Sequence, residues 1–124
     1  NDLGRIIYEP AARGQILGAI GQGLGEALME GMVFDGDGQP VTGSFMDYGI
    51  PRADDVPFVD VSWRETDSPG NLLGTKGVGE LASIGAPGLI VNAIMDALAE
   101  AGVRHLDRPL TPVKIWQALG RFRT

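Results

Sequence analysis

The sequence predicts an α+β fold in which about three helices pack on a small antiparallel sheet. Three segments carry apolar residues at helical spacing, and one run from Phe58 to Arg64 alternates between apolar and polar side chains. At 124 residues the chain has the length of one modest domain, and no internal repeat or linker divides it. We therefore treat residues 1–124 as a single domain or as a fragment of one.

The first helix is predicted from about Ala11 to Gly31, because Pro10 is tolerated in a first turn and apolar residues then recur every three or four positions. Four glycines in a helix interior cost about 3–4 kcal/mol relative to alanine, so we expect a neighbour to pack very close to this helix. The apolar, core-facing stripe consists of Leu17, Ile20, Leu24 and Leu28, and the glycine stripe beside it of Gly14, Gly18, Gly21 and Gly25.

Polar side chains flank the glycine stripe of this helix. Gln15, Gln22 and Glu26 share one face at 100° per residue. One interpretation is a tight helix–helix contact with a solvated polar edge, which is the more common arrangement. The other is a carboxamide that reaches a planar ligand, because glutamine offers both a hydrogen-bond donor and an acceptor.

The middle of the chain changes to strand-like patterns. A turn signal from Asp35 to Gly38, followed by a returning strand from Val41 to Tyr48, predicts a β-hairpin. The alternating run Phe58 to Arg64 predicts a half-buried strand. The Asp-Gly repeat lacks the other ligands of a calcium loop, including its late bidentate glutamate, so we predict a turn there and no metal site.

Two further helices are predicted in the last third of the chain. The first runs from about Ala86 to Ala101 and is stopped by Gly102. The second starts at Thr111-Pro112, which supplies a capping hydroxyl and a proline in the first turn. The single histidine, His105, has no second nitrogen ligand nearby, and we interpret it as structural. The apolar side of the last helix consists of Ile115, Trp116, Leu119 and Phe122.

Charge and composition exclude several classes of protein. The net charge is −6, with 10 Lys and Arg against 16 Asp and Glu, which argues against nucleic-acid binding. Without cysteine the sequence holds no disulfide, thiolate zinc site or cysteine-ligated iron–sulfur cluster. No apolar run reaches the length of a membrane span, and we expect a cytoplasmic protein. Because the chain begins without Met, we expect a processed chain or a fragment of a longer one.

The stretch Gly74 to Glu80 is the strongest candidate for chemistry. Three glycines in six residues allow a sharp turn and close approach of another group, and a carboxylate closes the run. On spacing alone, Glu80 is better explained as an acid that complements the positive end of the following helix dipole. The alternative is a general base presented by a glycine-rich turn.

Familiar nucleotide and nucleophile motifs do not fit this sequence. Gly21-Gln22-Gly23-Leu24-Gly25 is not G-x-G-x-x-G, and Gly74-Thr75-Lys76-Gly77 lacks the residue order of a phosphate loop, so a nucleotide-binding module ranks last. One histidine and no cysteine leave no nucleophilic triad. The groups left for chemistry are Glu80, Lys76, the two glutamines and exposed backbone N–H groups. None of these is an electrophile or a redox centre, which implies that the reactive centre is a bound group that this chain does not itself supply.

Eight segments follow one another in order along nearly the whole chain. They are Asp2-x-Gly4-Arg5-x-Ile7, Gly14-Gln15-Ile16-x-Gly18-x-Ile20-x-Gln22-Gly23-x-Gly25, Thr42-Gly43-Ser44-Phe45-Met46-Asp47-Tyr48, Ile50-Pro51-Arg52, Gly74-x-Lys76-Gly77-Val78-Gly79-Glu80, Ile84-Gly85-Ala86-Pro87, Asn92-Ala93-x-x-Asp96-Ala97 and Pro109-Leu110-Thr111-Pro112. This ordered series resembles the C-terminal part of the molybdopterin-binding large subunit of the molybdenum hydroxylases, the family of xanthine dehydrogenase, aldehyde oxidase and carbon monoxide dehydrogenase.

The resemblance implies a role for each candidate residue. Glu80 matches the family's active-site glutamate, a base that takes a proton during hydroxylation of an aldehyde or N-heterocycle at an electron-poor carbon. Gln15 matches a glutamine that hydrogen-bonds the molybdopterin, and Gln22 is a weaker match of the same kind. The backbone from Lys76 through Gly77 and Val78 to Gly79 is expected near the metal centre, with no metal ligand from this chain.

The resemblance also implies cofactors and partners outside this sequence. The molybdenum cofactor, as molybdopterin or its cytosine dinucleotide form, would bind together with the rest of the subunit. Iron–sulfur clusters and FAD belong to other domains or subunits of the family, and a homo-oligomer is possible. The chain alone is expected to be inactive. The alternative function is a non-catalytic assembly module with the same fold and no cofactor.

Overall fold

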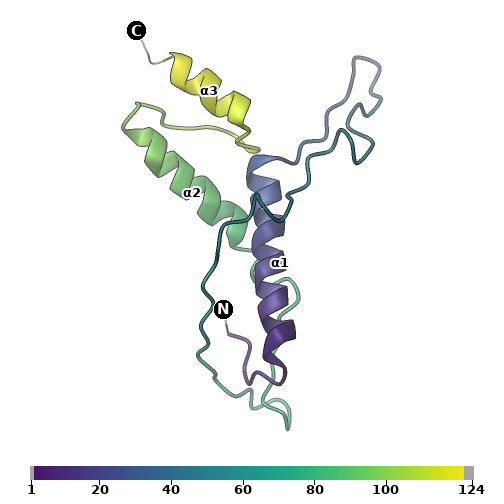
Figure 1. The fold of residues 1–124 in the computed structure, drawn as a ribbon, viewed down its shortest axis with the longest axis vertical. Coiled ribbons are helices and arrows are strands. Elements are labelled where there is room, and N and C mark those ends of the chain that lie inside the picture. The colour runs from purple at the N-terminus through teal and green to yellow at the C-terminus, as the bar shows by residue number, and fades with distance from the viewer. Residues whose placement is uncertain (1, 122–124) are drawn as a thin grey trace.

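The computed structural model describes residues 2–121 and contains three helices in this range: α1 (Glu9–Leu28), α2 (Ala86–Ala99) and α3 (Pro112–Arg121). Helix α1 is the central element, α2 packs against it, and α3 lies beside α2 at the end of the chain (Figure 1). A long arm leaves the C-terminal end of α1, and a long irregular segment returns along α1 before the glycine-rich stretch (Figure 1). The three predicted helices are confirmed.

The buried face of α1 differs from the predicted stripe by about one position. Leu24 is buried as expected, whereas Leu17, Ile20 and Leu28 are only half-buried. Small residues let neighbouring segments pack closer to the helix than leucine does. The buried face of α1 is therefore formed largely by small residues and not by the predicted leucine and isoleucine side chains. The buried residues of the helix are Ile16, Ala19, Gly23, Leu24, Gly25 and Ala27.

The closest helix contact is made by a glycine outside the predicted stripe. A Cβ atom at Gly23 would lie 2.5 Å from Cβ of Ala86 and 3.0 Å from Cδ of Pro87, so the start of α2 packs directly on the α1 backbone. By contrast, a Cβ at Gly14 or Gly18 would meet no atom of the described residues within 4 Å. The close contact that we predicted for this helix is therefore present at Gly23 and, within the predicted stripe, at Gly25, where a Cβ would lie 2.8 Å from Cδ of Pro51; it is absent around the first turns.

The predicted antiparallel sheet is wrong for the described residues. They contain two isolated antiparallel bridges, Gly4 with Thr75 and Phe34 with Pro40, and no strand ladder. Between residues 57 and 65 side-chain burial does alternate as predicted, with Val61 half-buried and Phe58 95% exposed. No backbone group of this segment hydrogen-bonds another backbone group of residues 2–121. A strand requires a paired neighbour, and this part of the chain supplies none.

The predicted hairpin is confirmed only at its turn. Asp35 accepts hydrogen bonds from the backbone N–H groups of Asp37 and Gln39 through one carboxylate oxygen, each at 2.9 Å, and Gly38 adopts a positive φ of 79°. Val41 N–H donates to the Val33 carbonyl at 2.9 Å, but the predicted strand Val41 to Tyr48 bends into a second turn instead of pairing further. The Asp35 carboxylate thus stabilises the turn, as expected for an aspartate that precedes glycine.

Two apolar clusters form the core: one consists of Leu3, Ile16, Ala19 and Ala82, and the other joins α2 to α3. Gly102, with φ of 80°, ends α2, and the Val103 N–H then donates back to the Leu98 carbonyl, as predicted for this helix stop. The Thr111 hydroxyl accepts from the Lys114 N–H at 3.3 Å and so caps α3 as expected. The buried members of the second cluster are Leu98, Val103 and Ala118.

The predicted apolar side of α3 is confirmed for Ile115 and Leu119, which pack against this cluster. Trp116 differs from the prediction, because it is 73% exposed. Phe122, like Asn1, lies outside the described residues. Leu110, just before α3, is fully buried, and its N–H donates to the Ala27 carbonyl at 2.7 Å, which ties the end of the chain to α1. None of the helices in the described range is long and apolar enough to cross a membrane.

Candidate cofactor cleft

An open cleft of about 430 Å³ lies between the first turns of α1 and the glycine-rich stretch. The segment before α1 contributes Ile7 and Tyr8 to its wall, and α1 contributes Gln15. These three side chains are exposed in the described structure. The opposite wall is formed by Lys76, Val78 and Gly79. The structure therefore brings four of the seven predicted site residues, which lie about 60 positions apart in the sequence, to one place.

The remaining predicted site residues have different positions. Gly77 lies between the lining residues Lys76 and Val78, and Glu80 directly follows Gly79, but neither lines the cleft itself. Gln22 lies almost two turns further along α1, in another groove that it shares with Arg52, and its amide donates to Glu26 at 3.3 Å. Gln22 is thus separated from the group formed by Gln15 and residues 76–79.

The segment before α1 holds the glycine-rich stretch in place through backbone hydrogen bonds. Lys76 N–H donates to the Leu3 carbonyl and Arg5 N–H donates to the Gly74 carbonyl, each at 2.9 Å, on either side of the Gly4–Thr75 bridge. Gly4 has φ of 66°, and a Cβ there would lie only 3.0 Å from the Lys76 nitrogen. Only glycine permits this crossing, because any side chain would clash with the opposing backbone.

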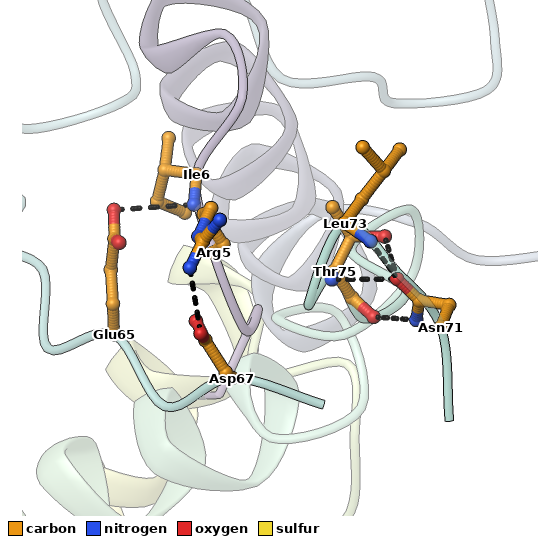
Figure 2. A network of polar contacts seen from close by, with 7 residues as sticks. All are labelled: Arg5, Ile6, Glu65, Asp67, Asn71, Leu73 and Thr75. Atoms are coloured by element: carbon orange, nitrogen blue, oxygen red, sulfur yellow. Dashed lines mark hydrogen bonds and ion pairs between the residues drawn. The ribbon is translucent and has the colours of Figure 1, made fainter. Parts of the chain in front are cut away.

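Side chains from residues 65–67 reinforce the same crossing (Figure 2). Arg5 and Asp67 form an ion pair at 2.7 Å, and the Glu65 carboxylate accepts a hydrogen bond from the Ile6 N–H at 3.2 Å. Both residues of the Arg5–Asp67 pair are more than half exposed, so the pair contributes little to overall stability. Its effect is geometric, since it fixes where residues 4–6 lie against the stretch that forms the cleft.

The side chain of Lys76 is directed away from the cleft by its own partners. Its ammonium group forms an ion pair with Asp2 and donates to the Thr66 hydroxyl at 3.1 Å. The other carboxylate oxygen of Asp2 accepts from the Gly4 N–H at 3.0 Å. The hydrogen bond from Lys76, with smaller contributions from Thr66 and Gly4, holds the pKa of Asp2 well below its ordinary value of 3.8. Lys76 can therefore contribute to the cleft through its backbone and its aliphatic stem.

Replacing Asp2 by asparagine is expected to destabilise the crossing of residues 3–5 with residues 74–76 in a pH-dependent way. The folded-state pKa of Asp2 is depressed, so its stabilising effect is present above pH 3.8 and is lost as the pH falls toward the lower folded-state value. In the full-length protein the exchange of the Lys76 amide should be faster in Asp2→Asn than in wild type at pH 6. The difference should shrink as the pH falls below 3.8. Equal exchange rates at pH 6 would contradict the expectation.

The backbone after Lys76 offers free hydrogen-bond donors. None of the hydrogen bonds among residues 2–121 has the N–H of Gly77, Val78, Gly79 or Glu80 as its donor. A Cβ at Gly77 or Gly79 would meet nothing within 4 Å, so this backbone is open to close approach. Successive unpaired N–H groups suit a ligand that is rich in oxygen acceptors.

Glu80 is not the helix-capping acid that its spacing favoured. Helix α2 begins six residues later at Ala86, has Gly85 at its N-cap and carries no acidic residue in its first turn. The helix-dipole effect falls off within that first turn, so it does not account for Glu80. Glu80 is exposed, and its backbone carbonyl accepts from the Ser83 hydroxyl at 2.8 Å.

The anchoring residues of the cleft were missed by sequence reasoning. Asn71 could have been identified, since asparagine in a Pro-Gly-Asn loop commonly bonds nearby backbone. Asp2 and Asp67 could not, because their partners are distant in sequence. The residues between 2 and 121 contain no group of three or more His, Cys, Asp and Glu able to hold a metal ion. Any metal in this cleft would therefore be held by other atoms.

The cleft fits an organic, oxygen- and nitrogen-bearing cofactor. The exposed Gln15 carboxamide can donate and accept, the opposite wall presents unpaired backbone N–H groups, and the glycines there leave space for a planar group. A free carboxylate follows directly at Glu80. The arrangement can bind such a group between α1 and the glycine-rich stretch and place one proton acceptor beside it.

Comparison with known proteins agrees with this fit. The Molybdopterin cofactor-binding domain family matches residues 1–57. Subunit gamma of the 6-hydroxypseudooxynicotine dehydrogenase complex of Paenarthrobacter nicotinovorans is 48% identical over 117 residues, which cover 93% of this chain and 14% of that protein. The carbon monoxide dehydrogenase large chain of Hydrogenophaga pseudoflava is 34% identical over 119 residues, covering 96% of this chain and 15% of that protein.

The fold has a close counterpart among solved structures. The crystal structure of quinoline 2-oxidoreductase from Pseudomonas putida 86 superposes with a TM-score of 0.89 and 41% identity, covering 96% of this chain and 15% of that one. The fold and cleft thus define part of a molybdopterin cofactor-binding domain. The chain belongs to the family of molybdenum-binding large subunits that includes the xanthine and carbon monoxide dehydrogenases, and it spans about one seventh of their length.

Proposed function

We propose that this chain is the segment of a molybdenum-cofactor hydroxylase that supplies the catalytic base, Glu80, and part of the cofactor clamp. The substrate class is an aldehyde or an N-heterocycle, hydroxylated at an electron-poor carbon. The observation that carries the proposal is the cleft itself. Gln15 lies on one wall of the cleft, and Val78 and Gly79, whose backbone N–H groups are unpaired in the described structure, lie on the other; the exposed Glu80 follows directly.

Each residue of the clamp has a defined task. The Gln15 carboxamide would hydrogen-bond the pterin, and the N–H groups of Gly77, Val78 and Gly79 would donate to acceptor atoms of the cofactor. Gln22, in its separate groove, is at most a contact to a more remote part of the same ligand. When bound, the molybdenum cofactor supplies the two-electron redox chemistry of the hydroxylation.

Glu80 supplies the proton transfer. Its exposed carboxylate has no hydrogen-bond donor among the described residues, so an oxygen atom of that group is free to accept a proton. A base must reach the proton that it abstracts to within hydrogen-bond distance, and the open backbone at Gly79 lets a ligand approach Glu80 closely. Because the remaining walls of such a site lie outside this sequence, the isolated chain should be inactive.

The proposal extends to partners and location. The remainder of the large subunit would complete the site, and iron–sulfur and FAD domains or subunits would carry electrons onward in a cytoplasmic enzyme. Two relatives are named as a complex subunit and as a large chain, which supports an assembly of several polypeptides. The cofactor is molybdopterin or its cytosine dinucleotide form, because the proposed contacts of this cleft are all to the pterin that both forms share.

Cofactor analysis of the full-length protein tests the proposed function. We expect metal analysis to give about one molybdenum per subunit and the oxidised extract to show pterin fluorescence. Release of the nucleotide on acid hydrolysis would identify the dinucleotide form. A full-length protein that folds and assembles without molybdenum or pterin, when expressed in a host that makes the cofactor, would identify a non-catalytic assembly module instead.

A further inference from the structure

We propose that Asn71 is a positioning residue for the cleft: its carboxamide sets the path of residues 76–80 and thereby the place of Glu80. This inference rests on the proposed function, in which Glu80 is the base. Asn71 is itself exposed and is not among the residues that line the cleft. It acts through the backbone of the turn that precedes the lining residues.

Both ends of the Asn71 carboxamide are engaged (Figure 2). Its oxygen accepts from the Leu73 N–H at 3.1 Å and from the Thr75 N–H at 3.2 Å. Its nitrogen donates to the Thr75 carbonyl at 2.9 Å. One side chain therefore fixes both backbone polar groups of Thr75 and closes a turn in which Gly74 has φ of 70°. The pattern uses the donor and the acceptor of a carboxamide together, so neither aspartate nor serine reproduces it.

The neighbouring backbone groups are held from the opposite side. The Gly74 carbonyl accepts from the N–H groups of Arg5 and Ser68, and the Lys76 N–H donates to Leu3. Residues 74–76 are thus fixed between Asn71 on one side and residues 3–5 on the other. Removing Asn71 frees the two groups of Thr75 while leaving the contacts to residues 3–5 in place.

The path of the segment beyond Lys76 depends on the hydrogen bonds that Asn71 makes to Thr75. The N–H groups of residues 77–80 make no hydrogen bond within the described chain, and the first backbone bond beyond them is from Leu81 to the Val78 carbonyl at 3.3 Å. The Glu80 carbonyl also accepts from the Ser83 hydroxyl, and Val78 packs against the core, so the stretch is held by residues 75–76 before it and by residues 81–83 after it. A rotation of Thr75 would change the first of these two supports and so shift the backbone that leads to Glu80.

The hydrogen bonds of Asn71 position the turn but contribute little to the overall stability of the protein. Asn71, Leu72 and Leu73 are exposed, and Leu72 lies entirely in solvent, so the turn buries no core side chain. Loss of the carboxamide should leave the helices and both apolar clusters intact. Its effect should be confined to the order of the glycine-rich stretch and to the step that requires Glu80.

The test compares Asn71→Ala and Asn71→Asp with Asn92→Ala in the full-length protein. Asn92 is an exposed asparagine of α2 whose side chain makes no hydrogen bond in the described structure, so it controls for the substitution itself. The first readout is amide hydrogen exchange of residues 73–76, whose N–H groups are hydrogen-bonded, in cofactor-free protein. We expect exchange about tenfold faster in Asn71→Ala, less in Asn71→Asp, and unchanged in Asn92→Ala.

The second readout is turnover per bound molybdenum. We expect Asn71→Ala to lower kcat about tenfold with KM within about threefold of wild type, because a displaced base impairs the chemical step more than substrate binding. Molybdenum content and Tm should stay at wild-type values. If turnover falls only in proportion to lost molybdenum or lost folded protein, Asn71 is structural and the inference is wrong.

The outcomes separate this inference from the proposed function. If Glu80→Gln abolishes turnover while Asn71→Ala matches Asn92→Ala in exchange and kcat, only the positioning role is overturned. If Glu80→Gln leaves turnover intact, the base assignment fails, and with it the claim that Asn71 positions a base. Fast exchange in Asn71→Ala together with a reduced kcat per molybdenum supports both.

Discussion

Replacing Glu80 by glutamine in the full-length protein should lower kcat by about 10²–10⁴-fold, the usual contribution of a general base. Glutamine keeps the size and hydrogen-bonding reach of the side chain but cannot take up a proton. Because the exposed Glu80 side chain makes no hydrogen bond or ion pair in the described structure and lies outside the helix caps, the substitution should leave folding and molybdenum content unchanged. Steady-state kinetics normalised to molybdenum measure the effect.

The matched control for this prediction is Glu100→Gln. Glu100 is an exposed glutamate at the C-terminal end of α2, so the same chemical change is made far from the cleft. It should leave kcat within about twofold of wild type. Turnover of Glu80→Gln that stays within about tenfold of wild type, at equal molybdenum content, would show that another group acts as the base.

Replacing Gly23 by valine should cause a large loss of stability. Even one added carbon would lie 2.5 Å from Ala86 and 3.0 Å from Pro87, and both neighbours belong to the rigid start of α2. Overpacking of this kind costs about 1–3 kcal/mol, and valine adds two further carbons at the same contact. The free energy of unfolding, from denaturant titration of the full-length protein, should fall accordingly.

Gly88→Val is the control for the packing effect. Gly88 lies in the first turn of α2, where an added Cβ would meet nothing within 4 Å. Valine has a slightly better helix propensity than glycine, so this variant should change the free energy of unfolding by less than about 0.5 kcal/mol. Equal destabilisation by both substitutions would mean that the helix crossing does not depend on close approach at Gly23.

The sequence predicted helices better than it predicted strands, for a physical reason. Each helix carries its own start and stop signals, such as Thr111 and Gly102, within a few residues of its ends. A strand depends on a partner that can lie anywhere in the polypeptide. For the segment 57–65 the alternation of burial was predictable, but the described chain contains no pairing neighbour.

The candidate residues of the site could be named from the sequence, but the contacts that hold them in place could not. The resemblance selected Gln15 and residues 76–80, and the structure places Gln15, Lys76, Val78 and Gly79 around one cleft. Spacing alone favoured the wrong explanation for Glu80, although the predicted start of α2 at Ala86, which the structure confirms, lies six residues beyond it. The ion pairs of Asp2 and Asp67 join residues more than 60 positions apart, for which a single sequence gives no signal.

The crossing of residues 3–5 with residues 74–76 also sets an order of events during synthesis. Asp2 and Lys76 are 74 positions apart, so at about 5–20 residues per second the second wall of the cleft leaves the ribosome roughly 4–15 s after the first. During that interval α1 can form, but the segment before it has no partner. A nascent chain in this state carries only the wall of the cleft that includes Ile7 and Tyr8, and the wall that includes Val78 and Gly79 is added once those residues have left the ribosome.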